Sequence, residues 1–105
     1  SFVVSIAFAQ DEKFHFEGRI VDLNNNPIPD VYILNYRNQD KNVSRQNGVF
    51  DAWVLPSDSL MISHVSYYRK VVTVYSLMFN PVIKLQPDTI NIAEVILYVL
   101  IFLFI

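Results

Sequence analysis

Residues 43–50, Val-Ser-Arg-Gln-Asn-Gly-Val-Phe, carry the strongest local structural signal in the chain. The dipeptide Asn47-Gly48 tolerates positive φ at both central positions of a type I′ turn, the turn that joins two antiparallel strands most tightly. Phe50 opens a run of alternating side chains that is typical of a strand. The stretch therefore predicts a β-hairpin, with Asn47 and Gly48 as its structural turn.

Upstream of this hairpin, residues 14–23 alternate between two kinds of side chain. Phe16, Gly18 and Ile20 fall on one face, and the odd-numbered residues 17, 19 and 21 fall on the other. A period of two predicts a half-buried strand.

A turn segment with two prolines follows that strand. Pro27 and Pro29 lie within residues 24–30, and proline cannot donate to a sheet ladder. The asparagines before Pro27 favour turn conformations. We expect Pro27 and Pro29 to be structural turn residues.

The rest of the middle segment reads as short strands separated by turn residues. Segment 36–42 is polar and predicts a loop or an irregular edge, and only residues 76–79 fit a single helical turn. The chain is therefore predicted to be all-β, a seven-stranded antiparallel β-sandwich. The further strands are expected over residues 31–35, 50–54, 60–65, 69–75 and 81–85.

Length and charge narrow the function classes. The chain has 105 residues, which suits one small domain, and a net charge of −2, which argues against a nucleic-acid binder. It has no cysteine, so disulfides, thiolate metal sites and cysteine nucleophiles are excluded. We expect no cofactor.

Two apolar ends flank a soluble centre, residues 10–91. Residues 1–9 end in Ala-Phe-Ala and are interpreted as the end of a signal peptide, with an N-terminal strand or buried helix as the alternative. Residues 92–105 form a hydrophobic C-terminal segment. Residues 95–105 are too few to cross a bilayer, so this segment is interpreted as a final strand, the opening of a truncated span, or a corrupted reading frame.

The spacing of apolar and turn residues resembles the carboxypeptidase regulatory-like domain, a transthyretin-like (prealbumin-like) β-sandwich with Greek-key connections. The resemblance covers about residues 14–97. It rests on five motifs in register and a closing Ile92-Ala-Glu94-Val95: Phe16-x-Gly18-x-Ile20-x-Asp22, Pro27-Ile-Pro29-x-Val31, Asn47-Gly48-x-Phe50, Leu60-x-Ile62-Ser63-x-Val65-x-Tyr67 and Ile83-x-Leu85-x-Pro87.

The chain departs from the family pattern at turns and strand ends. Asp30 and Ser66 stand where the family often has glycine, and Ser44-Arg45 replaces the usual Thr-Asp. These departures bear on local turn geometry more than on the fold.

The resemblance implies an accessory role in an exported protein of the periplasm, outer membrane or cell surface. Partners would be neighbouring domains of a longer chain or a cell-envelope protein, with outer-membrane association. A similar module forms the N-terminal extension of SusC-type TonB-dependent receptors in Bacteroidetes, which is the first alternative. A carbohydrate-binding module is the second.

No catalytic or metal-binding site is expected. His15 and Glu17 share a strand face, but a zinc site needs at least a third ligand. His64 and Ser63 are neighbours on one strand and point to opposite faces, so they cannot act as base and nucleophile. Five aspartates scattered at turns are explained by turn chemistry: Asp22, Asp30, Asp40, Asp51 and Asp58.

The aromatic residues supply the candidate interface. Trp53 has the opposite parity to Phe50, which places it on the outer face of its strand. Trp53, Tyr67 and Tyr68 are the residues expected to contact a partner.

Overall fold

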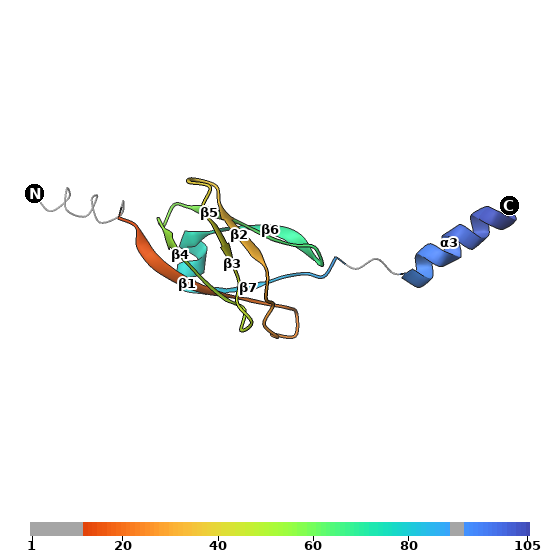
Figure 1. The fold of residues 1–105 in the computed structure, drawn as a ribbon, viewed down its shortest axis with the longest axis horizontal. Coiled ribbons are helices and arrows are strands. Elements are labelled where there is room, and N and C mark those ends of the chain that lie inside the picture. The colour runs from red at the N-terminus through yellow and green to blue at the C-terminus, as the bar shows by residue number, and fades with distance from the viewer. Residues whose placement is uncertain (1–11, 89–91) are drawn as a thin grey trace, which may run out of the picture.

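The computed structural model describes residues 12–88 and 92–105 (Figure 1). The expected end of a signal peptide, residues 1–9, lies outside the described residues. The elements in chain order are β1 (Phe14–Val21), β2 (Tyr32–Asn35), β3 (Lys41–Val43), β4 (Val49–Val54), β5 (Ser59–His64), β6 (Tyr67–Thr73), α2 (Val74–Phe79), β7 (Val82–Lys84) and α3 (Ile92–Phe104).

The strands form two sheets, as a β-sandwich requires. One sheet has the order β4-β1-β7 and the other has the order β3-β2-β5-β6. Four apolar residues from the two sheets and their connections have no exposed surface: Ile20, Val31, Phe50 and Ile62. These are apolar positions of the family-like motifs, and they meet in one core because inward-facing residues recur every second position along a strand.

The expectation of a wholly antiparallel sandwich is wrong for the first sheet. β7 pairs with β1 in parallel, through Arg19↔Val82, Ile20↔Ile83 and Val21↔Lys84. Parallel neighbours need a long crossover connection, and here the whole second sheet lies between the two strands in the chain. Alternation shows that a segment is a strand, but it does not show the direction of its partner.

The turn at Asn47-Gly48 also differs from the expected type I′ hairpin. Gly48 donates its N–H to the carbonyl of Arg45 at 2.8 Å, and Arg45 donates to the carbonyl of Val49 at 2.9 Å. Gly48 has φ of +78°, whereas Asn47 is not left-handed. This is a three-residue loop that ends on a left-handed glycine. It carries the chain from one sheet to the other, because β3 and β4 belong to different sheets.

Strand limits shift modestly from those expected. β3 occupies the end of the segment predicted as a loop or irregular edge and pairs with β2. The run predicted as a strand over residues 69–75 is β6 up to Thr73, and its last two residues begin α2. The Thr73 hydroxyl accepts the N–H of Ser76 at 3.2 Å and caps this helix. The single expected helical turn is therefore confirmed, with an earlier start.

The proline turn packs against the left-handed glycine. Pro27 forms an isolated bridge with Val21, and a Cβ added at Gly48 would lie 3.0 Å from the Cβ of Pro27. Ser44, one of the departures from the family pattern, is buried and ties this turn to β2. Its hydroxyl donates to the carbonyl of Ile28 at 2.8 Å and accepts the N–H of Val31 at 2.9 Å.

Asp30, which directly follows Pro29, adopts a left-handed conformation with φ of +62°. The left-handed region costs an L-residue about 1–2 kcal/mol, whereas glycine adopts it without a Cβ clash. We expect Asp30→Gly to raise the free energy of unfolding by about 0.5–1 kcal/mol, after the larger entropy of glycine in the unfolded chain is subtracted. Denaturant unfolding measures this. Asp30→Ala should show no gain, and a loss on Asp30→Gly would contradict the interpretation.

The C-terminal segment is a helix, so the interpretation of residues 92–105 as a final strand is wrong. α3 follows the sandwich after the undescribed residues 89–91 and is drawn apart from it (Figure 1). Within the described residues, no helix combines the length and the apolarity that crossing a bilayer requires.

Candidate functional site

The outer face of the β1–β4 pair presents Trp53. The strands pair antiparallel with His15 opposite Trp53 and Glu17 opposite Asp51. Phe50 and Val54 point inward and are fully buried, whereas the Trp53 residue is 61% exposed. Trp53 thus points outward, as its parity in the sequence indicated.

Charged side chains surround Trp53 on this face. The ring of His15 packs edge-on against the indole, with 5.4 Å between ring centroids, and His15 Nε2 lies 3.7 Å from Asp51 Oδ2. Arg45 Nη1 contacts Asp51 at 3.4 Å, and Arg45 Nη2 contacts Glu17 at 3.8 Å. We call these five residues, His15, Glu17, Arg45, Asp51 and Trp53, the Trp53 face.

A shallow concavity adjoins the Trp53 face where β4 approaches the start of β3. Its volume is about 240 Å³, and its walls come from residues 15, 40–42 and 51–53. Pockets for drug-sized ligands measure about 300–1,000 Å³, so this hollow suits one side chain or one sugar ring. Besides Trp53, its lining includes three residues with polar or charged side chains: Asp40, Lys41 and Asn42.

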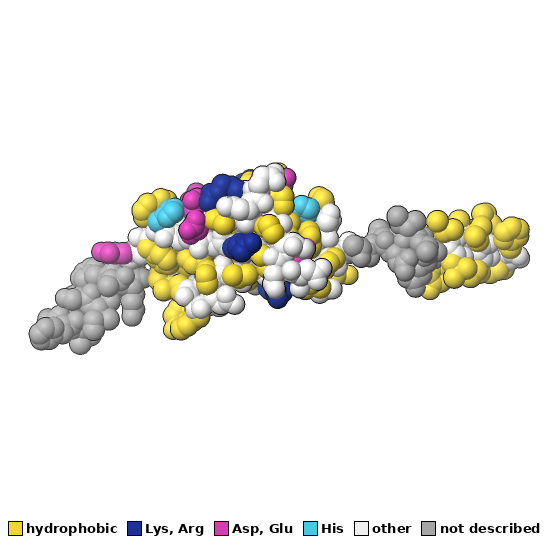
Figure 2. Space-filling model, turned by 90° about the horizontal axis from the view of Figure 1, so that it is seen from below, with side chains coloured by type: hydrophobic (Ala, Val, Ile, Leu, Met, Phe, Trp, Pro, Cys, Tyr) yellow, Lys and Arg dark blue, Asp and Glu magenta, His cyan; other side chains and the backbone are white. Residues whose placement is uncertain are grey.

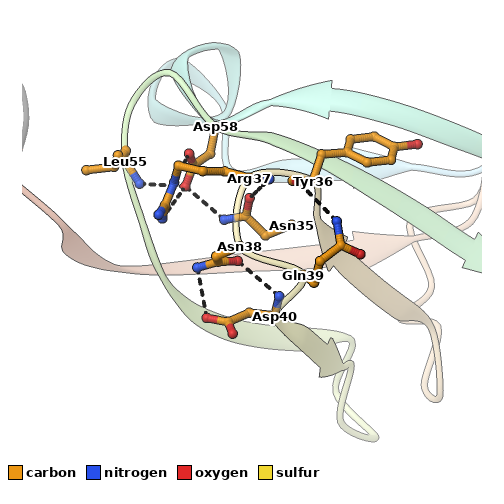
Figure 3. A network of polar contacts seen from close by, with 8 residues as sticks. All are labelled: Asn35, Tyr36, Arg37, Asn38, Gln39, Asp40, Leu55 and Asp58. Atoms are coloured by element: carbon orange, nitrogen blue, oxygen red, sulfur yellow. Dashed lines mark hydrogen bonds and ion pairs between the residues drawn. The ribbon is translucent and has the colours of Figure 1, made fainter.

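A buried polar network positions the loop that supplies Asp40 (Figure 3). The Asp58 side chain is 1% exposed and accepts hydrogen bonds from Arg37 Nε at 2.6 Å, Asn35 Nδ2 at 2.8 Å and the N–H of Leu55 at 2.9 Å. Asn35 in turn accepts the N–H of Arg37 at 2.9 Å. The network holds the β2–β3 loop against the β4–β5 turn.

The Asp58 carboxylate stays ionised because its partners outweigh its burial. Burial alone raises the pKa of Asp58, but the hydrogen bonds from Arg37, Leu55 and Asn35 bring that pKa below its ordinary value. The hydrogen bond to Asp58 likewise raises the pKa of Arg37. Sequence reasoning assigned Asp58 to turn chemistry alone. It missed the ion pair because 21 residues separate the partners.

Tyr67 and Tyr68 lie away from Trp53, around the turn between β5 and β6. We define the hairpin tip as residues 64–68. Tyr67 is half-buried against the core and packs its ring on His64 at 5.3 Å, whereas Tyr68 is exposed. A second concavity of about 480 Å³ lies here, lined by residues 63–65, 67–69 and 88. Histidine side chains lie well apart on the sandwich (Figure 2): His15 lines the first concavity and His64 lines the second.

The structure therefore splits the expected interface into two surfaces. Trp53 and the two tyrosines line separate concavities.

The histidines examined for catalysis or metal binding have structural contacts. His64 and Ser63 line one hollow, but the Nδ1 of His64 accepts the N–H of Ser66 at 3.1 Å, and this hydrogen bond holds the turn. Glu17 contacts Arg45 on the same face as His15. Across the described residues, no group of three or more His, Asp or Glu side chains is placed to hold a metal ion.

Comparison with known proteins finds no matching protein-family model, no matching curated protein and no matching solved structure.

Proposed function

We propose that this chain is a non-catalytic interaction module of an exported bacterial cell-envelope protein, and that it binds a neighbouring domain or a partner protein through the Trp53 face. The observation that carries the proposal is an indole exposed to 61% on a hydrogen-bonded strand pair. Tryptophan is among the residues most enriched at the energetic centres of protein interfaces.

The surroundings of Trp53 support this proposal in two ways. The indole packs against the His15 ring and stands on a hydrogen-bonded strand pair, so that binding would cost it little conformational freedom. The charged groups of Glu17, Arg45 and Asp51 form a polar border beside the apolar ring, the arrangement typical of an interface rim.

The family assignment belongs to the same proposal. A transthyretin-like sandwich of the carboxypeptidase regulatory-like type is supported by the two sheets and by the burial of the motif residues Phe16, Ile20, Phe50 and Ile62. The SusC-type alternative predicts what the gene would encode after this module. Sequence beyond residue 105 would encode a plug domain and a long series of barrel strands.

Loss of the Trp53 side chain is expected to weaken binding to the polypeptide encoded next to this module in its gene. Trp53→Ala should reduce the affinity about 30-fold or more, the effect of an interface centre, without lowering the stability of the sandwich. Titration calorimetry with the adjoining polypeptide measures this.

Tyr75→Ala is the matched control, because Tyr75 is equally exposed at 62% but lies on α2. It should leave the affinity unchanged. Undiminished binding by Trp53→Ala would refute the proposed face.

Carbohydrate binding is the second candidate, favoured by the concavity that combines an indole with Asp40, Lys41 and Asn42. Trp53 is the only tryptophan of the chain, so its fluorescence reports this site alone. Saturable changes in emission on adding a sugar would support this candidate. A flat response across mono- and oligosaccharides, with intact binding of the adjoining polypeptide, would exclude it.

A further inference from the structure

From Val95 onward, the side chains of α3 are exposed on every side of the helix. From Val95 to Ile105 every residue is apolar or aromatic, and the exposed fractions run from 46% to 98%. Tyr98 carries the only polar side-chain atom among them. On the face seen in Figure 2, the side chains of this helix are apolar, whereas the sandwich surface mixes apolar and charged side chains.

The apolar side chains on every side of the helix determine which environment can cover it. Successive residues of an α-helix point about 100° apart, so eleven apolar residues leave no polar face. A groove on a protein covers one stripe of a docked helix, and an interfacial helix keeps a polar side toward water. Hydrocarbon chains cover all sides equally, which matches residues 95–105.

The hairpin tip presents exposed apolar and aromatic side chains at the point where the chain leaves for α3. Asp88 donates its N–H to the carbonyl of Ser66 at 2.9 Å, which fixes the exit beside the hairpin tip. Val65, at the centre of this tip, is 96% exposed, and Tyr68 and Tyr32 are exposed near it. Four Cα–Cα steps separate Asp88 from Ile92, so the tip lies within about 15–20 Å of the start of α3.

We propose that α3 inserts into a lipid bilayer and that the hairpin tip rests on the headgroup layer. The 13 residues of α3 measure about 20 Å, against about 30 Å for the hydrocarbon core, so the described helix is long enough to reach well into the core. Tyrosine is enriched at the membrane–water boundary, which suits Tyr68 and Tyr32 beside Val65. This inference does not depend on a partner for the Trp53 face.

Flotation of the full chain with vesicles tests the insertion. We expect the chain to float with phosphatidylcholine vesicles. Leu100→Asp should lower the partition constant between vesicles and water at least tenfold, because a carboxylate is costly in hydrocarbon. Met78→Asp is the matched control, since Met78 is 52% exposed on the helix α2, at the far end of β6 from the tip. It should bind vesicles like the unchanged chain.

The absence of cysteine allows a dye to be placed at single positions to test the tip. A polarity-sensitive dye on Val65→Cys should shift to the blue when vesicles are added, whereas the same dye on Met78→Cys should not shift. Equal binding by Leu100→Asp would overturn the insertion of α3. Self-association of the chain through α3 without flotation would also overturn it, and an unshifted dye at position 65 on floated protein would overturn the contact of the tip.

Discussion

Replacing Asp58 by alanine is expected to lower the free energy of unfolding by about 2–5 kcal/mol, because each buried donor left without its acceptor costs about 1–3 kcal/mol. The substitution leaves Asn35 Nδ2 and the N–H of Leu55 without their acceptor at a site where the carboxylate is 1% exposed. Small domains have total stabilities of about 5–15 kcal/mol, so this loss is a large part of the whole. Denaturant unfolding at neutral pH measures it.

Asp51→Ala is the control for this prediction, because it also removes an aspartate that contacts an arginine. The Asp51 side chain is 42% exposed, and its contact with Arg45 is a surface pair. Surface pairs contribute about 0–1 kcal/mol, so the loss should be small. Equal losses at positions 51 and 58 would contradict the structural role assigned to the buried network.

The contribution of Asp58 should also depend on pH, with a sign fixed by its lowered pKa. A carboxyl with a lower pKa in the folded than in the unfolded state adds stability above the unfolded value, which is ordinarily near 3.8. That contribution disappears as the pH falls through the folded pKa, below 3.8. The difference between the unchanged protein and Asp58→Asn should therefore be constant near neutral pH and shrink in acid. A difference that grows in acid would contradict the direction of the pKa shift.

The parts of the fold that follow from local pattern could be predicted from the sequence. Alternation identified the inward faces of β1 and β4, and Phe16, Ile20 and Phe50 are buried accordingly. The outward direction of Trp53 follows from the same parity. Turn residues marked most strand ends because proline fixes φ and cannot donate to a sheet ladder, whereas glycine and asparagine tolerate the positive φ that turns need.

Features that depend on distant pairing could not be predicted in this way. The parallel pairing of β7 with β1, the contact of Arg37 with Asp58 and the approach of Asp51 to His15 all join residues far apart in the chain. The walls of the Trp53 concavity come from both sheets, so its shape depends on how the sheets meet. The hydrophobicity of residues 92–105 was evident, but the mixture of β-branched and aromatic residues gave no period that separates helix from strand.

Replacing Gly48 by alanine is expected to lower the free energy of unfolding by about 2–5 kcal/mol, which combines the cost of a left-handed L-residue with that of overpacking. A Cβ at this position would lie 2.5 Å from the carbonyl oxygen of Ile20 and 3.0 Å from Pro27. Both neighbours belong to the backbone or to a rigid ring, so neither can move away cheaply. Gly48 also accepts the N–H of Ile20 at 2.8 Å, so a shift of the loop would break the hydrogen bond beside β1.

The effect of Asn47→Ala on stability distinguishes the observed three-residue loop from the type I′ turn that the sequence predicts. In a type I′ turn both residues are left-handed, so both substitutions would carry that backbone cost. In the structure only Gly48 is left-handed, and Asn47 contributes one exposed hydrogen bond, from the N–H of Val49 to Asn47 Oδ1 at 3.1 Å. Asn47→Ala should therefore cost about 1 kcal/mol or less. Thermal unfolding of the two variants side by side measures the contrast, and similar losses at the two positions would mean that the chain passes between its sheets through a different turn.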